Sequence, residues 1–418
     1  MWSRSILPYD IIALIIDIVG EDEDTELLKE LALVSHSFNQ ICSKHIFATV
    51  ELHDASLSHW DDGLNWHAAS SKKRFVKLLK SRPGVVKYIR KLTYEVSHNE
   101  FRFLNDDHRL SRVLPNLLRT IPHLNCLTID GSKLDWNTLD PSLSSAFLYL
   151  MHLPTVNHVD LSFIQNFPLS SFARSVNLRR LDICDVEPPE EEIVVQSEMM
   201  PKFRELLSIK SAMLTSRLLH AKTQDGHPAF NFMDLKQLSI CLADEQNILY
   251  LLKYAPVLEK LHLTTLESDQ SLERLHDMLS ACAGTLKVLD LTLLLHKEHD
   301  GSLNLPFKGL CEGLEEMVGN NKLEALSLEV ELTRDETGDD IGCMIQSVEK
   351  VLVKPGWPAL KQVSFKVSVS CCLVRDSAEL AEELQYLLPS TYLTHISKLD
   401  SVAFDFSSYV ENCYLHVH

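Results

Sequence analysis

A short apolar pattern recurs along most of the chain and predicts a repeating fold. Apolar residues stand at the first, fourth and sixth positions of segments such as LNCLTI, LEKLHL and LKVLDL. The pattern starts at Ile89, Leu124, Val156, Leu178, Leu235, Leu258, Leu286, Leu323, Leu360 and Leu399, and a copy with one extra residue starts at Phe203. Several intervening segments, at 112–123, 245–256 and 271–284, have helical spacing. Residues 83–418 therefore predict an α/β array of parallel strands, with the three apolar positions facing one core and with covering helices.

Residues 1–52 predict a small all-helical block. The segment LPYDIIALIIDIVG is too short and too interrupted by Pro8, Asp10 and Asp17 to span a membrane, and its acids do not suit a signal peptide. Its apolar positions predict one helix, and those of residues 27–47 predict a second helical pattern, which Asp24 or Thr25 caps. A third short helical or turn segment is expected to end at Ile46-Phe47. Val50 to Leu52 alternates like a strand that enters the next region.

Residues 53–82 predict a linker followed by a basic amphipathic helix. The stretch 53–71 is polar and lacks a sustained period, and we expect Trp60 and Trp66 to pin it onto a neighbouring helix. The helix that follows has Phe75, Leu78 and Leu79 on one face and basic residues on the other, and it ends at the Pro-Gly pair at 83–84.

Charge is unevenly distributed along the chain. The 418 residues carry a net charge of −18, yet residues 72–91 contain basic side chains and no acid. The basic segment is a candidate contact for nucleic acid or for an acidic partner, or simply a solvated helix face. The acidic remainder of the chain and the lack of interleaved aromatic residues argue against nucleic acid.

The residue types and spacings of common catalytic and metal sites are missing from the sequence. The glycines never occur as GxG, and neither the phosphate-binding loop motif nor HExxH nor GxSxG is present. The ten cysteines form no CxxC pair, and the HxH pair of His416 and His418 fits a solvated terminus. We therefore expect no enzymatic activity, no cofactor and no metal, and we expect reduced thiols in the cytoplasm, the nucleus or both.

The repeated segments resemble leucine-rich repeats in an irregular form. The Asn or Cys that this family places after the strand is not consistent, since Val186 stands there in the LRRLDI unit. Successive copies begin 22 to 39 residues apart. The resemblance implies a solenoid of stacked parallel strands with covering helices, without a regular curvature.

The N-terminal block resembles an F-box. The resemblance rests on Leu7-Pro8 before a short helix, then on LALVS at 31–35, and on the aromatic residues Phe38 and Phe47. The chain departs from the family in its long acidic connection from Gly20 to Thr25 and in having Phe where Trp is frequent. The resemblance implies binding to the adaptor subunit of SCF-type cullin–RING ubiquitin ligases, and through it to a cullin. The adaptor-binding residues that it implies are Leu7, Pro8, Ile11, Ile12, Ile15, Ile16, Leu31, Val34 and Phe47, with Leu7 and Pro8 as the strongest candidates.

Two functions remain open from the sequence. In the first, the chain is the substrate-recognition subunit of such a ligase, and its repeats bind an unknown target protein. In the second, it is a leucine-rich-repeat scaffold outside any ligase, and the N-terminal helices cap the repeat array. A docking block can be removed without destabilising the repeats, whereas a cap cannot.

Overall fold

The computed structural model describes residues 8–22, 24–53, 71–96, 108–189, 194–195, 203–210, 217–218, 221–223, 229–241, 245–265, 274–295, 307–333, 338–371, 377–399 and 401–412. The chain divides into two compact units, residues 1–201 and residues 202–418, which are described separately below. The expected linker at 53–71 falls almost wholly outside the described residues, and so do Trp60 and Trp66. None of the described helices is long and apolar enough to cross a membrane.

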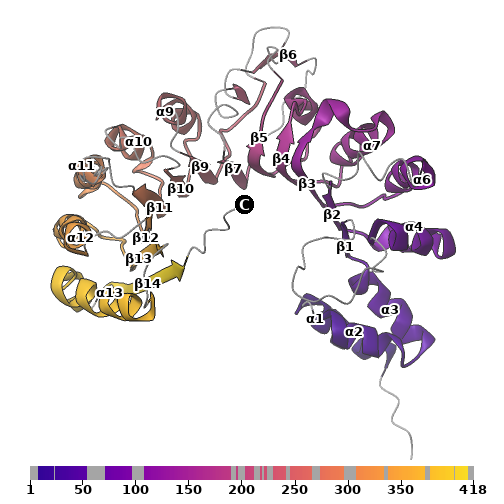
Figure 1. Cartoon of the computed structure of the whole chain (residues 1–418), viewed down its shortest axis with the longest axis horizontal. Coiled ribbons are helices and arrows are strands. Elements are labelled where there is room, and N and C mark those ends of the chain that lie inside the picture. The colour runs from indigo at the N-terminus through magenta and orange to yellow at the C-terminus, as the bar shows by residue number, and fades with distance from the viewer. Residues whose placement is uncertain are drawn as a thin grey trace, which may run out of the picture. The chain divides into compact units, whose positions relative to one another are not determined.

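The first unit begins with three helices and continues with parallel strands. The helices are α1 (Tyr9–Glu21), α2 (Thr25–Ala32) and α3 (His36–Ile46). The strands lie in the order β1 (Thr49–Leu52), β2 (Lys91–Glu95), β3 (Cys126–Asp135), β4 (His158–Gln165) and β5 (Arg180–Val186), each parallel to the next. The helices α4 (Ser71–Ser81), α6 (His108–Leu118) and α7 (Pro141–Met151) lie along one face of these strands (Figure 1). The 3-10 turns η1 (Pro83–Tyr88), η2 (Trp136–Thr138) and η3 (Leu169–Arg174) and the short strand β6 (Val194–Val195) complete the unit.

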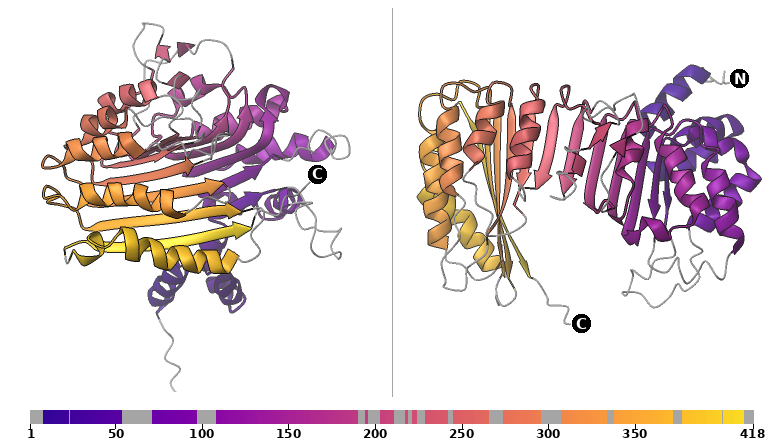
Figure 2. Two further views of the ribbon diagram at one scale, coloured as in Figure 1. Left: turned by 60° about the vertical axis from the view of Figure 1, so that its left-hand side comes forward. Right: turned by 90° about the horizontal axis from the view of Figure 1, so that it is seen from above.

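The second unit repeats the same arrangement. Its parallel strands follow in the order β7 (Leu206–Lys210), β9 (Gln237–Cys241), β10 (Lys260–Thr264), β11 (Val288–Leu295), β12 (Ala325–Thr333), β13 (Gln362–Cys371) and β14 (Ala403–Asn412). The helices α9 (Glu245–Tyr254), α10 (Leu275–Cys282), α11 (Phe307–Met317), α12 (Gly338–Leu352) and α13 (Ser377–Tyr392) form a layer on one face, as Figure 2 shows. The short strand β8 (Lys222–Thr223) and the turn η4 (Ile396–Lys398) complete the unit. The predicted α/β fold of sequential parallel strands with covering helices is confirmed, and it is consistent with a leucine-rich-repeat-like solenoid.

The apolar pattern forms the core in the predicted way. In the LKVLDL unit, Leu286 lies in the turn before β11, while Leu289 and Leu291 lie in the strand, and all three are buried. Strand register places Leu289 beside Leu261 of β10 and Leu326 of β12, so equivalent residues form continuous apolar rows. Only the last copy, in β14, has half-buried side chains, because no further described strand lies beside it.

Main-chain hydrogen bonds fix the position of most of the strands relative to the previous repeat. The N–H groups of Lys287 and Val288 both donate to the carbonyl oxygen of Glu259, at 2.8 and 3.0 Å. One repeat later, Glu324 and Ala325 both donate to the carbonyl oxygen of Lys287. The same pair of hydrogen bonds to one carbonyl oxygen precedes β2, β3, β4, β5, β10 and β13. Register therefore does not need the Asn side chain whose position varies in this sequence.

The helical pattern of residues 27–47 is interrupted in the structure. Helix α2 ends at Ala32, Leu33 and Val34 form the turn that follows, and Ser35 adopts an extended backbone with φ −160°. The Ser35 hydroxyl accepts a hydrogen bond from Phe38 N at 3.3 Å and so caps α3. The expected cap of α2 is confirmed as Asp24, whose carboxylate accepts from Leu27 N at 3.0 Å.

An aromatic cluster fills the core of the first unit. Phe147 of α7 meets Tyr94 of β2 edge to face at 4.8 Å between ring centroids. Trp136 and Phe167 make a second edge-to-face contact at 4.8 Å, and Phe172 lies 5.4 Å from Phe167. These rings join the helix layer to the strands, because they come from β2, α7 and the segments that follow β3 and β4.

Candidate protein-docking surface

A small core holds the N-terminal helices together. It consists of Ile16, Leu28, Ile41 and Cys42, which come from all three helices. Ile12, Ala13, Val19, Leu31, Ala32, Phe38 and Ile46 pack around it and are partly buried. The block thus uses one face of each helix for its own stability.

Helix α1 is apolar on its opposite face as well. Ile11, Leu14, Ile15 and Ile18 follow the i, i+3, i+4, i+7 spacing of one helical face, and their exposed fractions are 42 to 58%. A helix that is hydrophobic all round is normally buried. This face of α1, called the α1 stripe below, is therefore the surface of the block that a partner would cover.

A second exposed apolar feature lies where α2 meets α3. Leu33 is 86% exposed and Val34 is 65% exposed, and Leu27 of α2 is also exposed. The interruption of the helix at Ser35 causes this exposure, because it turns both side chains away from the core. Exposed large apolar residues thus concentrate on the N-terminal block, although scattered ones occur elsewhere in the described chain.

Asp17, one of the two aspartates inside α1, ties the helix to α3. Asp17 Oδ1 lies 2.6 Å from Lys44 Nζ and 2.8 Å from His45 Nε2. The Lys44 ammonium and the His45 ring, by hydrogen bonding to the carboxylate, hold the pKa of Asp17 below its ordinary value. Asp17 therefore serves the block's own structure. The four side chains of the α1 stripe are all aliphatic.

A close helix contact at Gly20 yields a prediction on the block's stability. A Cβ at Gly20 would lie 2.2 Å from His45 Nδ1, so any side chain there must displace the ring and break its hydrogen bond to Asp17. We expect Gly20→Val to destabilise the block by about 1–3 kcal/mol, as overpacking does. Hydrogen exchange of the α1 to α3 amides should become faster in the full chain. Gly84→Val is the control, because a Cβ at Gly84 has no neighbour within 4 Å, and equal protection in both variants would contradict the prediction.

The structure divides the expected adaptor-binding residues into three groups. Ile11, Ile15, Val34 and Pro8 are exposed, and Pro8 stands at the N-cap of α1. Ile12, Leu31 and Phe47 are half-buried, and Ile16 is 1% exposed within the core. Leu7 lies outside the described residues. Ile16 thus does not have the surface exposure that direct contact with a partner requires, because it fills the space between the three helices.

Leu14, Ile18 and Leu33 are missing from the sequence-based set. Leu14 and Ile18 follow Ile11 at i+3 and i+7, so helical spacing could have identified them. Leu33 could not be found in this way, because its exposure depends on the interruption at Ser35.

The block joins the repeats through its third helix. α3 contacts η1, and only Phe47 and Ala48 separate α3 from β1. The carbonyl oxygen of Ala48 accepts hydrogen bonds from the N–H groups of Arg90 and Lys91 at 2.8 and 2.9 Å. The α1 stripe takes no part in these bonds.

The basic segment 72–91 is a weaker candidate site than the sequence indicates. Lys72 is 1% exposed, and its Nζ lies 4.4 Å from the centroid of the Tyr94 ring. The placement of Lys72 on the basic outer face of α4 is therefore wrong, since its side chain is buried like that of Phe75. The exposed basic residues of α4 are Lys73, Arg74, Lys77 and Lys80.

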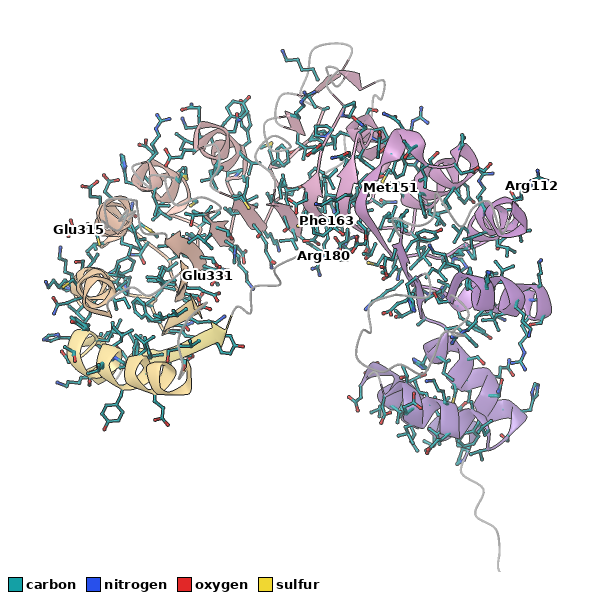
Figure 3. All side chains as sticks on the ribbon, in the orientation of Figure 1. Arg112, Met151, Phe163, Arg180, Glu315 and Glu331 are labelled. Atoms are coloured by element: carbon teal, nitrogen blue, oxygen red, sulfur yellow. The ribbon has the colours of Figure 1, made fainter. Side chains whose placement is uncertain are left out.

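The chain matches no protein-family model and no curated protein. The class of protein that the structure defines is an α/β repeat protein, with sequential parallel strands and covering helices after an N-terminal helical block. Figure 3 shows that the strands leave one face without covering helices: Phe163 and Arg180 in the first unit point away from the helix layer, as does Glu331 in the second.

Proposed function

We propose that the chain is a substrate-recognition subunit of an SCF-type cullin–RING ubiquitin ligase. The observation that carries this proposal is the α1 stripe, an exposed apolar helix face on a block that resembles an F-box in sequence. The block would dock on the adaptor through this stripe and the neighbouring Leu33–Val34 turn. The repeats would hold a target protein on the strand face that the helices leave open.

In this role the chain itself performs no covalent chemistry. A receptor that binds both the adaptor and a target raises the effective concentration of the target's lysines near the activated ubiquitin. The open strand face suits target binding, because its polar side chains project from a rigid sheet. The target itself is unknown, and we propose only that it is a protein.

The test changes two residues of the α1 stripe in the full chain, by the double substitution Ile11→Asp, Ile15→Asp. Two carboxylates would have to be buried against an apolar partner, so we expect adaptor affinity to fall by about 100-fold or more. Co-purification and titration with the purified SCF adaptor subunit measure the loss. The control is Tyr386→Asp, Leu387→Asp on α13, where both side chains are likewise exposed. Equal adaptor binding by all three proteins, or binding by none, would contradict the proposal.

The alternative is a repeat scaffold that works outside any ligase, with the block as a cap. The direct passage from α3 into β1 favours this alternative, since the block lies at the start of the repeat array. Removal of residues 1–46 separates the two functions. A docking block predicts that the repeats keep their unfolding temperature and lose adaptor binding, whereas a cap predicts a lower unfolding temperature, because its removal uncovers apolar repeat surface.

A further inference from the structure

Three polar side chains meet on the open face of the first unit. They are Cys126 of β3, His158 of β4 and Asp182 of β5, from three neighbouring strands. Parallel register places Cys126 directly beside His158, and His158 beside Arg180. Asp182 lies two residues further along β5. Figure 3 shows Arg180 on the face that lacks helices, and the His158 and Asp182 side chains are partly exposed there.

Both nitrogens of the His158 ring are engaged. Nε2 lies 2.8 Å from Asp182 Oδ2, and Nδ1 lies 3.3 Å from Cys126 Sγ. The hydrogen bond to Asp182, and then that to Cys126, raise the pKa of His158 to about 9. The ring is consequently an imidazolium at neutral pH, with an N–H group toward each partner. The sulfur then accepts a hydrogen bond from Nδ1–H, a contact that stabilises negative charge on the sulfur when it acts as a nucleophile.

The surrounding charges are mixed but include two further cations. Lys91 of β2 is the register partner of Cys126 on its other side, and Arg180 of β5 flanks His158. Asp160 of β4 stands beside Asp182 and adds negative charge. The imidazolium nevertheless contacts the Cys126 sulfur directly, with Nδ1 at 3.3 Å from Sγ.

Other cysteines of the chain have different surroundings. Burial raises the pKa of Cys282 to about 12 and that of Cys311 to about 11, which keeps both as thiols. Cys184 Sγ lies 3.8 Å from the Asp185 carboxylate. Cys343 on α12 is exposed and serves as a reference thiol. The described residues hold no group of three ligands that could bind a metal ion, so the cluster around Cys126 is not explained as a metal site.

We propose that Cys126 is a modification site that reacts with soft carbon electrophiles, in particular α,β-unsaturated carbonyl compounds. The thiolate lone pair forms a carbon–sulfur bond to the β-carbon, and the π electron pair of the double bond moves to the α-carbon. That carbon takes the Nδ1 proton of His158, which leaves a neutral imidazole still bonded to Asp182. Asp182 is the positioning residue, because it holds the ring with Nδ1 toward the sulfur. The proposal is independent of adaptor binding.

The test uses N-ethylmaleimide on the full chain at pH 6.5, with mass spectrometry resolving each cysteine. We expect Cys126 to react about tenfold or more faster than Cys343, because the His158 Nδ1–H group stabilises negative charge on the attacking sulfur and supplies the proton that the product takes up. A Cys126 rate that does not exceed that of Cys343 would overturn the proposal.

Two variants test whether His158 and Asp182 cause the fast reaction of Cys126. His158→Gln should slow Cys126 about tenfold or more at pH 6.5, and Asp182→Asn should slow it less, while Cys343 keeps its rate. Protection of the buried Cys42, which belongs to the same unit as the cluster, reports that each variant is folded. If Cys42 stays protected and Cys126 keeps its full rate in His158→Gln, the imidazolium has no role and the proposal fails. If one variant exposes Cys42, the other variant and the comparison with Cys343 in the unmodified chain decide.

Discussion

Glu349→Ala is expected to lower the free energy of unfolding of the second unit by about 3 kcal/mol, since it leaves buried hydrogen-bond donors without an acceptor. Glu349 of α12 is 2% exposed. Its Oε1 accepts from the N–H groups of His395 at 2.7 Å and Ile396 at 3.0 Å, and its Oε2 lies 3.3 Å from His395 Nδ1. The carboxylate thus holds the chain that leads through η4 into β14. Chemical denaturation of the full chain measures the loss.

Two further variants test whether the hydrogen bonds cause that loss. Glu349→Gln keeps an oxygen that can accept from both N–H groups, so it should retain most of the stability. Glu315→Ala removes a carboxylate from a half-exposed ion pair with Lys354, and it should change stability by only about 0.5 kcal/mol. Equal stability of Glu349→Ala and Glu315→Ala would show that the buried contact contributes nothing.

Phe147→Ala should destabilise the first unit by about 3–5 kcal/mol, the range for removing a buried aromatic side chain. Phe147 is 1% exposed and meets Tyr94 and Trp136 at centroid distances of 4.8 and 6.3 Å. Its loss opens a cavity between α7 and the strands, which the rigid neighbouring rings cannot fill. Thermal unfolding followed by tryptophan fluorescence is a suitable measurement, because Trp136 belongs to the same cluster.

The matched control for Phe147 is Phe163→Ala in β4. Phe163 is exposed on the open strand face and has a positive φ of 54°, a conformation that a bulky residue rarely adopts. Removing its ring should change stability by about 1 kcal/mol or less. A similar loss in both variants would mean that the aromatic cluster does not form the core of the unit.

The repeats could be predicted because their signal is local. The three apolar positions of each copy lie within six residues, and strand alternation converts them directly into a buried face. Lys72 could not be placed in this way. Its partner ring, Tyr94, is on a different element, and only the packing of α4 on the strands brings the two together.

The division of the α1 isoleucines into buried and exposed ones shows a second limit of sequence patterns. Ile11, Ile12, Ile15 and Ile16 are the same residue type, so apolar spacing cannot tell which of them face α2 and α3. The Cys126 cluster, in contrast, could have been found from the repeats. Cys126 and His158 occupy the third position of successive copies of the pattern, and parallel register aligns equal positions.

The double hydrogen bonds that precede the strands bear on how such a chain can change over evolutionary time. They join main-chain atoms at one equivalent point of the repeats that have them, so substitutions in the turn leave them intact unless proline removes a donor. Residues inserted between a strand and the next turn would enlarge the helical side and leave these hydrogen bonds in place. The wide spacing between copies, 22 to 39 residues, is compatible with this arrangement. Single repeats can therefore become longer or shorter, or change their surface side chains, while the order of the strands stays the same.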